Sequence, residues 1–226
     1  MIRVFIGYDS REAVAYSVLA HRIQARASAL VSITPLKLSD LKTVLTCERH
    51  PLQSTDFSFS RFLTPYLCDH TGWSVFMDCD MLMLRDIAEL WRLRDDRYAV
   101  MVVRHDHVPE ESTKFLGEPQ TSYEKKNWSS VILFNNALCH ALTPEYVNQA
   151  SGLDLHQFAW LENDDLIGAL PHEWNHLVGY DPPRPDAALV HFTLGGPYFP
   201  EHADCEFADE WRVEQEAMLD GEKRPE

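Results

Sequence analysis

The chain has 226 residues, a formal net charge of −15 at pH 7 and 45% hydrophobic residues. This length suits one folded domain, while the acidity argues against a nucleic-acid binder or an anionic-membrane adherer, because both need clustered Lys and Arg. No apolar run is long enough to span a membrane and no signal peptide precedes the first strand, so the sequence predicts a cytoplasmic protein without an integral membrane segment.

The chain opens with a strand, a polar turn and a helix. Residues 2–7 form an apolar run that predicts a buried strand, ending at Gly7, where the backbone can approach a ligand closely. A polar turn at 8–11 leads into a helix predicted over 12–27. This order is typical of nucleotide-binding α/β units, but the glycine patterns of dinucleotide-binding proteins and P-loop NTPases are absent, so neither class is favoured.

A second strand is predicted over 31–36 and a helix over 58–68. Arg61 lies in this helix among several aromatic residues. An arginine in such surroundings can be a surface residue that packs its aliphatic stem on the rings, or it can serve a binding site. Both interpretations stay open at this point.

The most informative stretch is the apolar run over 75–84, which contains Asp78 and Asp80. Strand side chains alternate between faces, so the two carboxylates point the same way while Cys79 points back. At the carboxyl end of a central strand, such a pair suits Mg²⁺ or Mn²⁺ shared with a substrate phosphate. The alternative is that the aspartates form a solvated turn or cap the helix predicted near 86–92.

The remaining elements alternate between strands and helices. The pattern predicts strands at 98–103, 128–134, 177–180 and 187–192, a helix from 143, and a helical segment over 153–170. The polar segment 105–126 is typical of a lid or binding loop, in which Lys114, Lys125 and Lys126 could hold phosphate. Asp164 and Asp165 could cap a helix or face a ligand.

The last predicted strand leads to His191, Gly195 and Gly196. A single histidine after an apolar strand is more often structural than a ligand. Two glycines within five residues nevertheless free backbone N–H groups that can cradle a phosphate. We therefore expect one nucleotide-binding domain over 1–205, followed by an acidic C-terminal helix and tail over 206–226.

Five motifs in order make the chain resemble glycosyltransferase family 8, which includes glycogenin and bacterial lipopolysaccharide galactosyl- and glucosyltransferases. They are the first strand with its Asp-containing turn, Phe-Ser-Arg-Phe-Leu-x-Pro-x-Leu, the Asp-x-Asp-Met-Leu segment with its downstream Glu-Leu-Trp, Asn-Trp-Ser-Ser-Val-Ile-Leu-Phe-Asn, and His-Phe-x-x-Gly. The resemblance spans residues 2 to about 200. It implies a single GT-A-type, Rossmann-like α/β domain with a mixed, mostly parallel central sheet flanked by helices.

The resemblance also implies an activity and its residues. The activity is transfer of a hexose from a UDP-sugar to a glycan or other hydroxyl acceptor, with retention and with Mn²⁺ or Mg²⁺ as the ion. The metal ligands are Asp78, Asp80 and His191, and the residues near the reacting sugar are Arg61, Asp164 and Asp165. The nucleotide contacts are Gly7, Tyr8, Asp9, Arg11, Asp78, Cys79, Gly195 and Gly196.

The chain departs from the family pattern at two motifs, and it lacks the basic, aromatic membrane tail of some bacterial relatives. Leu194 stands where the family has Gly, and Gly195-Gly196-Pro197-Tyr198 follows, so the phosphate-binding Lys is missing; Trp128-Ser129-Ser130 replaces the usual Asn-Ser/Ala-Gly. These changes leave open a catalytically silent protein that binds nucleotide sugars or glycans. A haloacid-dehalogenase-type phosphatase is a further alternative, although its motif needs Thr soon after the second Asp.

Overall fold

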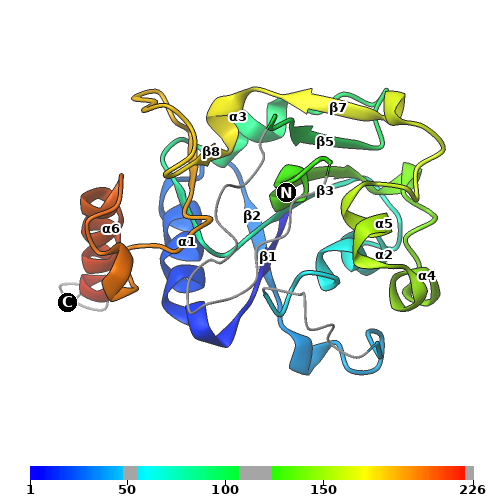
Figure 1. Cartoon of the computed structure of the whole chain (residues 1–226), viewed down its shortest axis with the longest axis horizontal. Helices are drawn as coiled ribbons and strands as arrows, with labels where there is room; N and C mark the ends of the chain where they lie inside the picture. The colour runs from blue at the N-terminus through cyan, green and yellow to red at the C-terminus, as the bar shows by residue number, and fades with distance from the viewer. Residues whose placement is uncertain (48–54, 107–123, 222–226) are drawn as a thin grey trace.

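The computed structural model describes residues 1–47, 55–106 and 124–221, in which helices flank a six-stranded and a three-stranded sheet (Figure 1). The strands of the large sheet, in spatial order, are β2 (Val31–Leu36), β1 (Ile2–Gly7), β3 (Trp73–Met77), β6 (Val131–Asn135), β5 (Val100–Val103) and β7 (Ile167–Leu170). β1 pairs in parallel with β2 and β3, and β5 with β7, whereas β6 is antiparallel to both neighbours. The predicted mixed, mostly parallel α/β sheet is confirmed.

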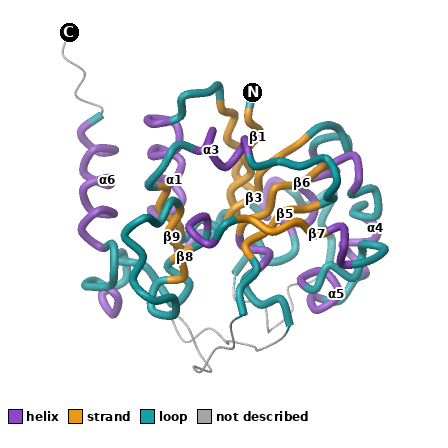
Figure 2. Tube along the Cα trace, turned by 90° about the horizontal axis from the view of Figure 1, so that it is seen from above, coloured by secondary structure: helices purple, strands orange, loops and turns teal. Residues whose placement is uncertain are grey.

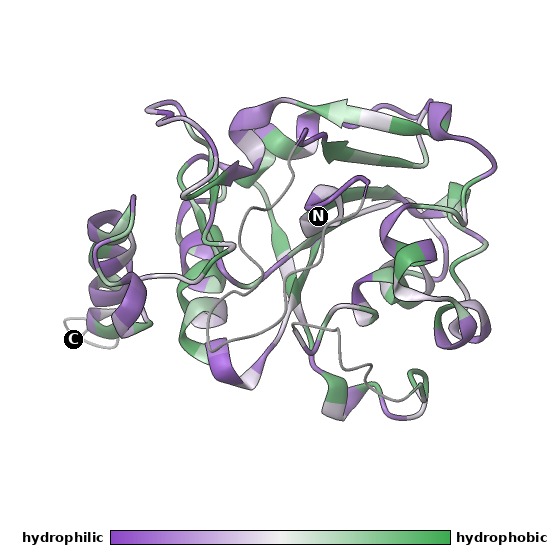
Figure 3. Ribbon diagram, viewed as in Figure 1, coloured by the Kyte–Doolittle hydropathy of each residue, from purple (hydrophilic) through white to green (hydrophobic). Residues whose placement is uncertain are grey.

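The sequence of each strand suits its place in the sheet. β5 and β6 are buried along their whole length and consist mainly of β-branched and other apolar residues, which favour strands that are covered on both faces. β2 carries Pro35 and lies at the edge, where a missing N–H is tolerated. In Figure 3, β5 is coloured as strongly hydrophobic.

Helices cover the sheet from two sides, as the perpendicular views of Figures 1 and 2 agree. α1 (Ala13–Arg26) and α6 (Ala208–Asp220) lie at one side, and α2 (Thr64–Leu67), α4 (Pro144–Gln149) and α5 (Gly152–His156) lie at the other. Local side chains start several helices. Thr143 caps α4, Ser151 and Asp154 form a capping box on α5, and Asp86 caps α3 (Ile87–Arg92).

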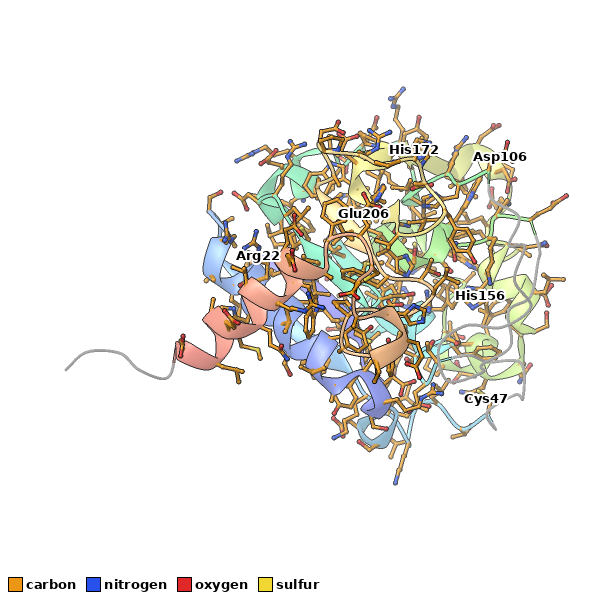
Figure 4. The ribbon with its side chains drawn as sticks, turned by 60° about the vertical axis from the view of Figure 1, so that its left-hand side comes forward. Arg22, Cys47, Asp106, His156, His172 and Glu206 are labelled. Carbon is orange, nitrogen blue, oxygen red and sulfur yellow. The ribbon has the colours of Figure 1, made fainter. Side chains whose placement is uncertain are left out.

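The small sheet consists of β4 (Met81–Met83), β9 (Leu189–His191) and β8 (His176–Leu177). A second apolar core lies between this sheet, α1 and α6, and it includes Val18, Leu82, Val190, Phe192 and Trp211. Glu214 of α6 is also buried, and its carboxylate accepts hydrogen bonds from Arg22 and lies 2.9 Å from His21 Nδ1. Both contacts hold α6 against α1, and Figure 4 shows Arg22 beside α6.

The structure confirms one sequence expectation and corrects another. β3 ends at Met77, so Asp78 and Asp80 follow the carboxyl end of a central strand as expected, and the rest of the apolar run at 75–84 forms β4 of the small sheet. The segment 153–170 is not one helix: α5 ends at His156, and Ile167–Leu170 pairs with β5 instead. The predicted lid over 105–126 falls mostly in 107–123, outside the described residues, as does Lys114.

Candidate metal and nucleotide site

The Asp-x-Asp turn follows the carboxyl end of β3, near the middle of the large sheet. Asp78 is 9% exposed and Asp80 is 4% exposed. The backbone N–H of Asp78 donates to Ser130 O (3.0 Å), because β3 and β6 pair antiparallel and Met77 lies opposite Val131. The turn is thus fixed between two sheets, which excludes the alternative of a solvated turn.

The small sheet brings His191 to this turn. β9 pairs antiparallel with β4, Met81 lies opposite His191, and the N–H of Phe192 donates to Asp80 O (2.9 Å). His191 is 2% exposed, and its Nε2 lies 3.4 Å from Asp80 Oδ2. The predicted convergence of Asp78, Asp80 and His191 is therefore present, and it depends on strand pairing between distant parts of the chain.

Asn175 orients the histidine. Its Oδ1 lies 3.1 Å from His191 Nδ1, and its Nδ2 donates to Ser130 Oγ (2.8 Å). The hydroxyl of Ser130 in turn donates to Asn127 O. Because Nδ2 is the donor of the amide, Oδ1 accepts from a protonated Nδ1 of His191. Nε2 is then the ring nitrogen that faces Asp80, and it is the atom that could bind a metal.

These three side chains fit a divalent cation. One ligand atom of each of Asp78, Asp80 and His191 lies within 4.8 Å of the others, and all three residues are buried. Ligand atoms around an ion bound at about 2.1 Å lie about 3–4 Å apart, so small side-chain shifts would complete the geometry. Two carboxylates and one imidazole suit Mn²⁺ as well as Mg²⁺.

Arg61 belongs to the same site. Its guanidinium is buried between the rings of Phe57 and Phe76 (5.4 and 5.0 Å from the centroids). Nη1 donates to Ser129 O (2.8 Å) and lies 2.9 Å from Asp78 Oδ1. The interpretation of Arg61 as a surface residue is therefore excluded: it is a buried cation next to the first carboxylate, which offsets part of the cost of burying that charge.

The turn after β1 lies at the same sheet edge, because the parallel register places Ile6 opposite Met77. Asp9 is buried and accepts hydrogen bonds from the backbone and side chain of Arg11 and from the N–H of Asp56. Burial acts to raise the pKa of Asp9, but these hydrogen bonds outweigh it and leave the pKa below its ordinary value. Asp9 therefore stays ionised and holds Arg11.

Gly7 and Tyr8 have structural contacts of their own. A Cβ at Gly7 would lie 2.3 Å from Phe57 Cγ, so this position needs glycine for packing. The ring of Tyr8 packs edge-on against Tyr16 (5.4 Å between centroids), and Lys37 Nζ lies 5.3 Å from the Tyr8 centroid. The assignment of 7–11 to nucleotide contacts stays a prediction.

A second buried acid lies close to the Asp-x-Asp turn. Glu12 is fully buried and accepts a hydrogen bond from Tyr198 Oη (2.7 Å). Burial, followed by the charges of Glu12 and Asp80, raises the pKa of Tyr198 well above its ordinary value. Burial and the same two carboxylates also raise the pKa of Cys79, so its thiol is neutral.

The two glycines after His191 form a turn. Gly195 has φ 135°, which favours glycine, and its N–H donates to Phe192 O (2.8 Å). A Cβ at Gly196 would lie 2.3 Å from the ring of Tyr198. The turn thus directs Tyr198 towards Glu12, at the place where the family resemblance implies a phosphate-binding Lys.

The predicted pair Asp164 and Asp165 lies in the turn before β7. Both side chains are exposed, and Asp164 pairs with Lys125 (2.6 Å), which also donates to Gln157 O. Within the described residues, neither aspartate bonds to the metal-ligand candidates. Their role in orienting the sugar stays a prediction.

Sequence reasoning missed four of these residues: Asn175, Glu12, Tyr198 and Ser130. Asn175 carried no clear signal, because it lies in a mixed polar and apolar stretch with Glu173 and His176. The others could not be recognised, because their partners are more than 40 residues away in the sequence.

No family model matches this sequence. Protein CDI of Arabidopsis thaliana is 50% identical over 223 residues, which cover 95% of this chain and 86% of the relative. The chain belongs to the CDI protein family. In the described residues of this CDI-family chain, no helix is both long and apolar enough to cross a membrane.

Solved structures share the fold of this CDI-family chain. The bifunctional glycosyltransferase WbbM has a TM-score of 0.67 at 18% identity, and GlyE of Streptococcus pneumoniae TIGR4 has 0.61 at 14%. The chain is covered to 99% and 97%, but it spans only 51% and 62% of those proteins. Galactosyltransferase LgtC, with donor and acceptor sugar analogues, has a TM-score of 0.55 at 14% identity, covering 100% of this chain and 98% of LgtC.

The fold is therefore that of GT-A glycosyltransferases, which confirms the fold class that the family 8 resemblance implies. At these identities the comparison concerns the fold and carries no residue roles. It speaks against the phosphatase alternative.

Proposed function

We propose that this chain is a metal-dependent glycosyltransferase that moves a hexose from a UDP-sugar to a hydroxyl acceptor, such as a glycan, with retention of configuration. The observation that carries the proposal is the convergence of Asp78, Asp80 and His191, all buried and within 4.8 Å, at the end of a central strand of a GT-A fold. Ligands of open α/β sheets bind at this edge.

The protein's own groups would have distinct tasks in such a reaction. Asn175 keeps Nε2 of His191 available as a ligand atom, and Arg61 holds Asp78 in place. Arg61 also brings a positive charge next to the position where the diphosphate would lie. When bound, the divalent ion would supply Lewis-acid stabilisation of the departing diphosphate.

The test is UDP release from a panel of UDP-hexoses with and without Mn²⁺. We expect release in the presence of Mn²⁺, and a loss of at least about 100-fold in Asp80→Asn, because a ligand should matter at least as much as its outer-shell partners. Asp186→Asn is the matched control, because Asp186 is exposed and its ion pair is with Arg184 rather than with a residue of the candidate site. Unchanged release in Asp80→Asn would refute the proposal.

One observation favours a second candidate, a catalytically silent protein that binds nucleotide sugars. The segment after His191 lacks the family's phosphate-binding Lys, and its Tyr198 donates a hydrogen bond to the buried Glu12 instead of supplying a positive charge. Mn²⁺-dependent binding of UDP-sugars, with neither hydrolysis nor transfer over a broad acceptor panel, would support this candidate over the enzyme.

A further inference from the structure

Tyr198 and Glu12 join two turns that lie near the end and near the start of the sequence. Tyr198 Oη donates to Glu12 Oε1 (2.7 Å), and Glu12 is fully buried. Burial, followed by the charges of Glu12 and Asp80, raises the pKa of Tyr198, so its hydroxyl keeps the proton and acts as the donor. The hydrogen bond therefore has one fixed direction, from the phenol to the carboxylate.

The glutamate continues the turn at 8–11. It ends the short 3-10 helix Ser10–Glu12, which Asp9 caps, and α1 follows directly. Asp9 also accepts hydrogen bonds from Arg11 and from the N–H of Asp56. A group that is bonded to Glu12 is thus tied to the segment that we predict to contact the nucleotide.

The tyrosine belongs to the turn that follows His191. The backbone hydrogen bond from Gly195 to Phe192 O (2.8 Å) is local, so it shapes this turn without fixing its place against α1. The ring of Tyr198 packs on Trp211 of α6, with 5.4 Å between centroids. The ring is therefore held from the side of α6, while its hydroxyl is held from the side of α1.

The phenol lies between two parts of the candidate site, because the negative charges of both Glu12 and Asp80 act on it. His191 reaches the Asp-x-Asp turn through the pairing of β9 with β4, a contact that does not depend on the phenol. The three ligand candidates should therefore bind a cation without the Tyr198–Glu12 hydrogen bond. A nucleotide diphosphate, in contrast, would contact both the cation and the turn at 8–11. Its binding should depend on how these two parts are aligned.

We infer that Tyr198 is a positioning residue: its hydrogen bond to Glu12 aligns the turn at 8–11 with the metal-ligand candidates and so couples nucleotide binding to cation binding. The inference rests on the proposed function, because it presupposes a nucleotide at this edge of the sheet. The competing explanation is that the hydrogen bond only anchors α6 and the turn before it to α1. Such an anchor would contribute to stability and leave the coupling unchanged.

The experiment titrates UDP into wild type, Tyr198→Phe and Glu12→Gln by calorimetry, once with saturating Mn²⁺ and once with EDTA. The ratio of the two UDP affinities is the coupling factor, which typically amounts to about 5–150-fold between coupled sites. Tyr198→Phe removes only the hydroxyl, so we expect the coupling factor to fall by about three- to tenfold, the effect of one hydrogen bond. Glu12→Gln keeps an acceptor oxygen for the phenol and should retain most of the coupling.

A second titration, with Mn²⁺ alone, tests the specificity of the effect. We expect Tyr198→Phe to bind Mn²⁺ as wild type does, because strand pairing rather than the phenol brings the three ligand candidates together. Melting temperatures without ligand report the stability of each variant, so that a loss of coupling is distinguished from a loss of fold.

Matched controls make the same chemical changes on the other side of the sheet. Tyr66→Phe alters a tyrosine of α2 that is 39% exposed, and Glu145→Gln alters an exposed residue in the first turn of α4. Figure 1 shows α2 and α4 on the side opposite α1. Neither control should change the coupling factor.

The outcomes separate the two levels of inference. If wild type does not bind UDP with Mn²⁺, the proposed function fails and the positioning role falls with it. If wild type binds UDP without any gain from Mn²⁺, or if Tyr198→Phe keeps the full coupling factor, the positioning role is overturned while the nucleotide site stands. A loss of Mn²⁺ affinity without UDP in Tyr198→Phe would also overturn it, because the hydrogen bond would then support the metal ligands themselves.

Discussion

The sequence predicts that two pairs of aspartates belong to one active site. In the structure the two pairs differ in burial and in the charges that surround them. Asp78 and Asp80 are buried and held by Arg61, His191 and backbone groups from β6 and β9. Asp164 and Asp165 are exposed, and among the described residues Asp164 pairs with Lys125 and Asp165 belongs to the local turn. Uncompensated charge is costly only where water is excluded, so the first pair needs cations whereas the second does not.

Removing the cation that compensates Asp78 should have the largest effect. Arg61→Leu would leave a buried carboxylate without its guanidinium, and we expect the free energy of unfolding to fall by about 3–5 kcal/mol. Urea denaturation without metal measures this loss. The matched control is Arg97→Leu, because Arg97 pairs with Asp95 while 77% of its side chain is exposed, and a surface pair is worth at most about 1 kcal/mol. Equal losses in the two variants would contradict the comparison.

Releasing His191 from its partner should have the next largest effect. Asn175→Ala removes the amide that fixes the imidazole, and we expect Mn²⁺ affinity to fall by about 10–100-fold. Calorimetric titration with Mn²⁺ measures it. Asn148→Ala serves as the control, because the hydrogen bonds of Asn148 with described residues join α4 to the backbone around Val44, Thr46 and Cys47. A loss of the same size in both variants would show that His191 is not specifically positioned.

Acid should weaken the part of the site around Asp9. Hydrogen bonds hold the pKa of folded Asp9 below 3.8, so its carboxylate stabilises the protein above that pH, and the contribution disappears as the pH falls through the folded-state pKa. We expect Asp9→Asn to be less stable than wild type by about 1–2 kcal/mol at pH 7. The difference should shrink below pH 3.8, as followed by urea denaturation. A difference independent of pH would show that ionisation is not involved.

The smallest effect is expected in the exposed pair. Asp164→Asn removes a surface ion pair with Lys125, and the free energy of unfolding should change by less than about 0.5 kcal/mol. Turnover of a UDP-hexose separates the two possible roles of this residue. A fall in kcat without a change in stability would support the predicted contact with the sugar, and unchanged turnover would assign Asp164 to the surface.

Local sequence signals predicted those helices and strands that have a strong apolar pattern or a capping residue next to them in the sequence. The bounds of β1 and β2 agree with the expectation, and Thr143 with Pro144 starts α4 as predicted. The expected helix over 153–170 was wrong because pairing with β5 decides the conformation of Ile167–Leu170, whose apolar residues would also suit a helix. A non-local partner cannot be inferred from a short apolar run.

The candidate site shows the same limit. The Asp-x-Asp pair could be recognised from its apolar surroundings, whereas His191 was identified only through the family resemblance. Its approach to Asp80 requires the pairing of β4 with β9, and its orientation requires Asn175 and Ser130. These contacts join segments that no spacing rule connects.

The packing of Trp211 against Val190 in the second core, next to His191 on β9, has a consequence for synthesis on the ribosome. Both aspartates are synthesised well before the imidazole and the tryptophan that supports its strand, because Asp78 and Asp80 precede His191 and Trp211 by more than a hundred residues in the sequence. Cation capture would therefore have to wait until β9 and α6 have been made, and a premature stop codon ahead of α6 would impair it even though α6 contributes no ligand atom.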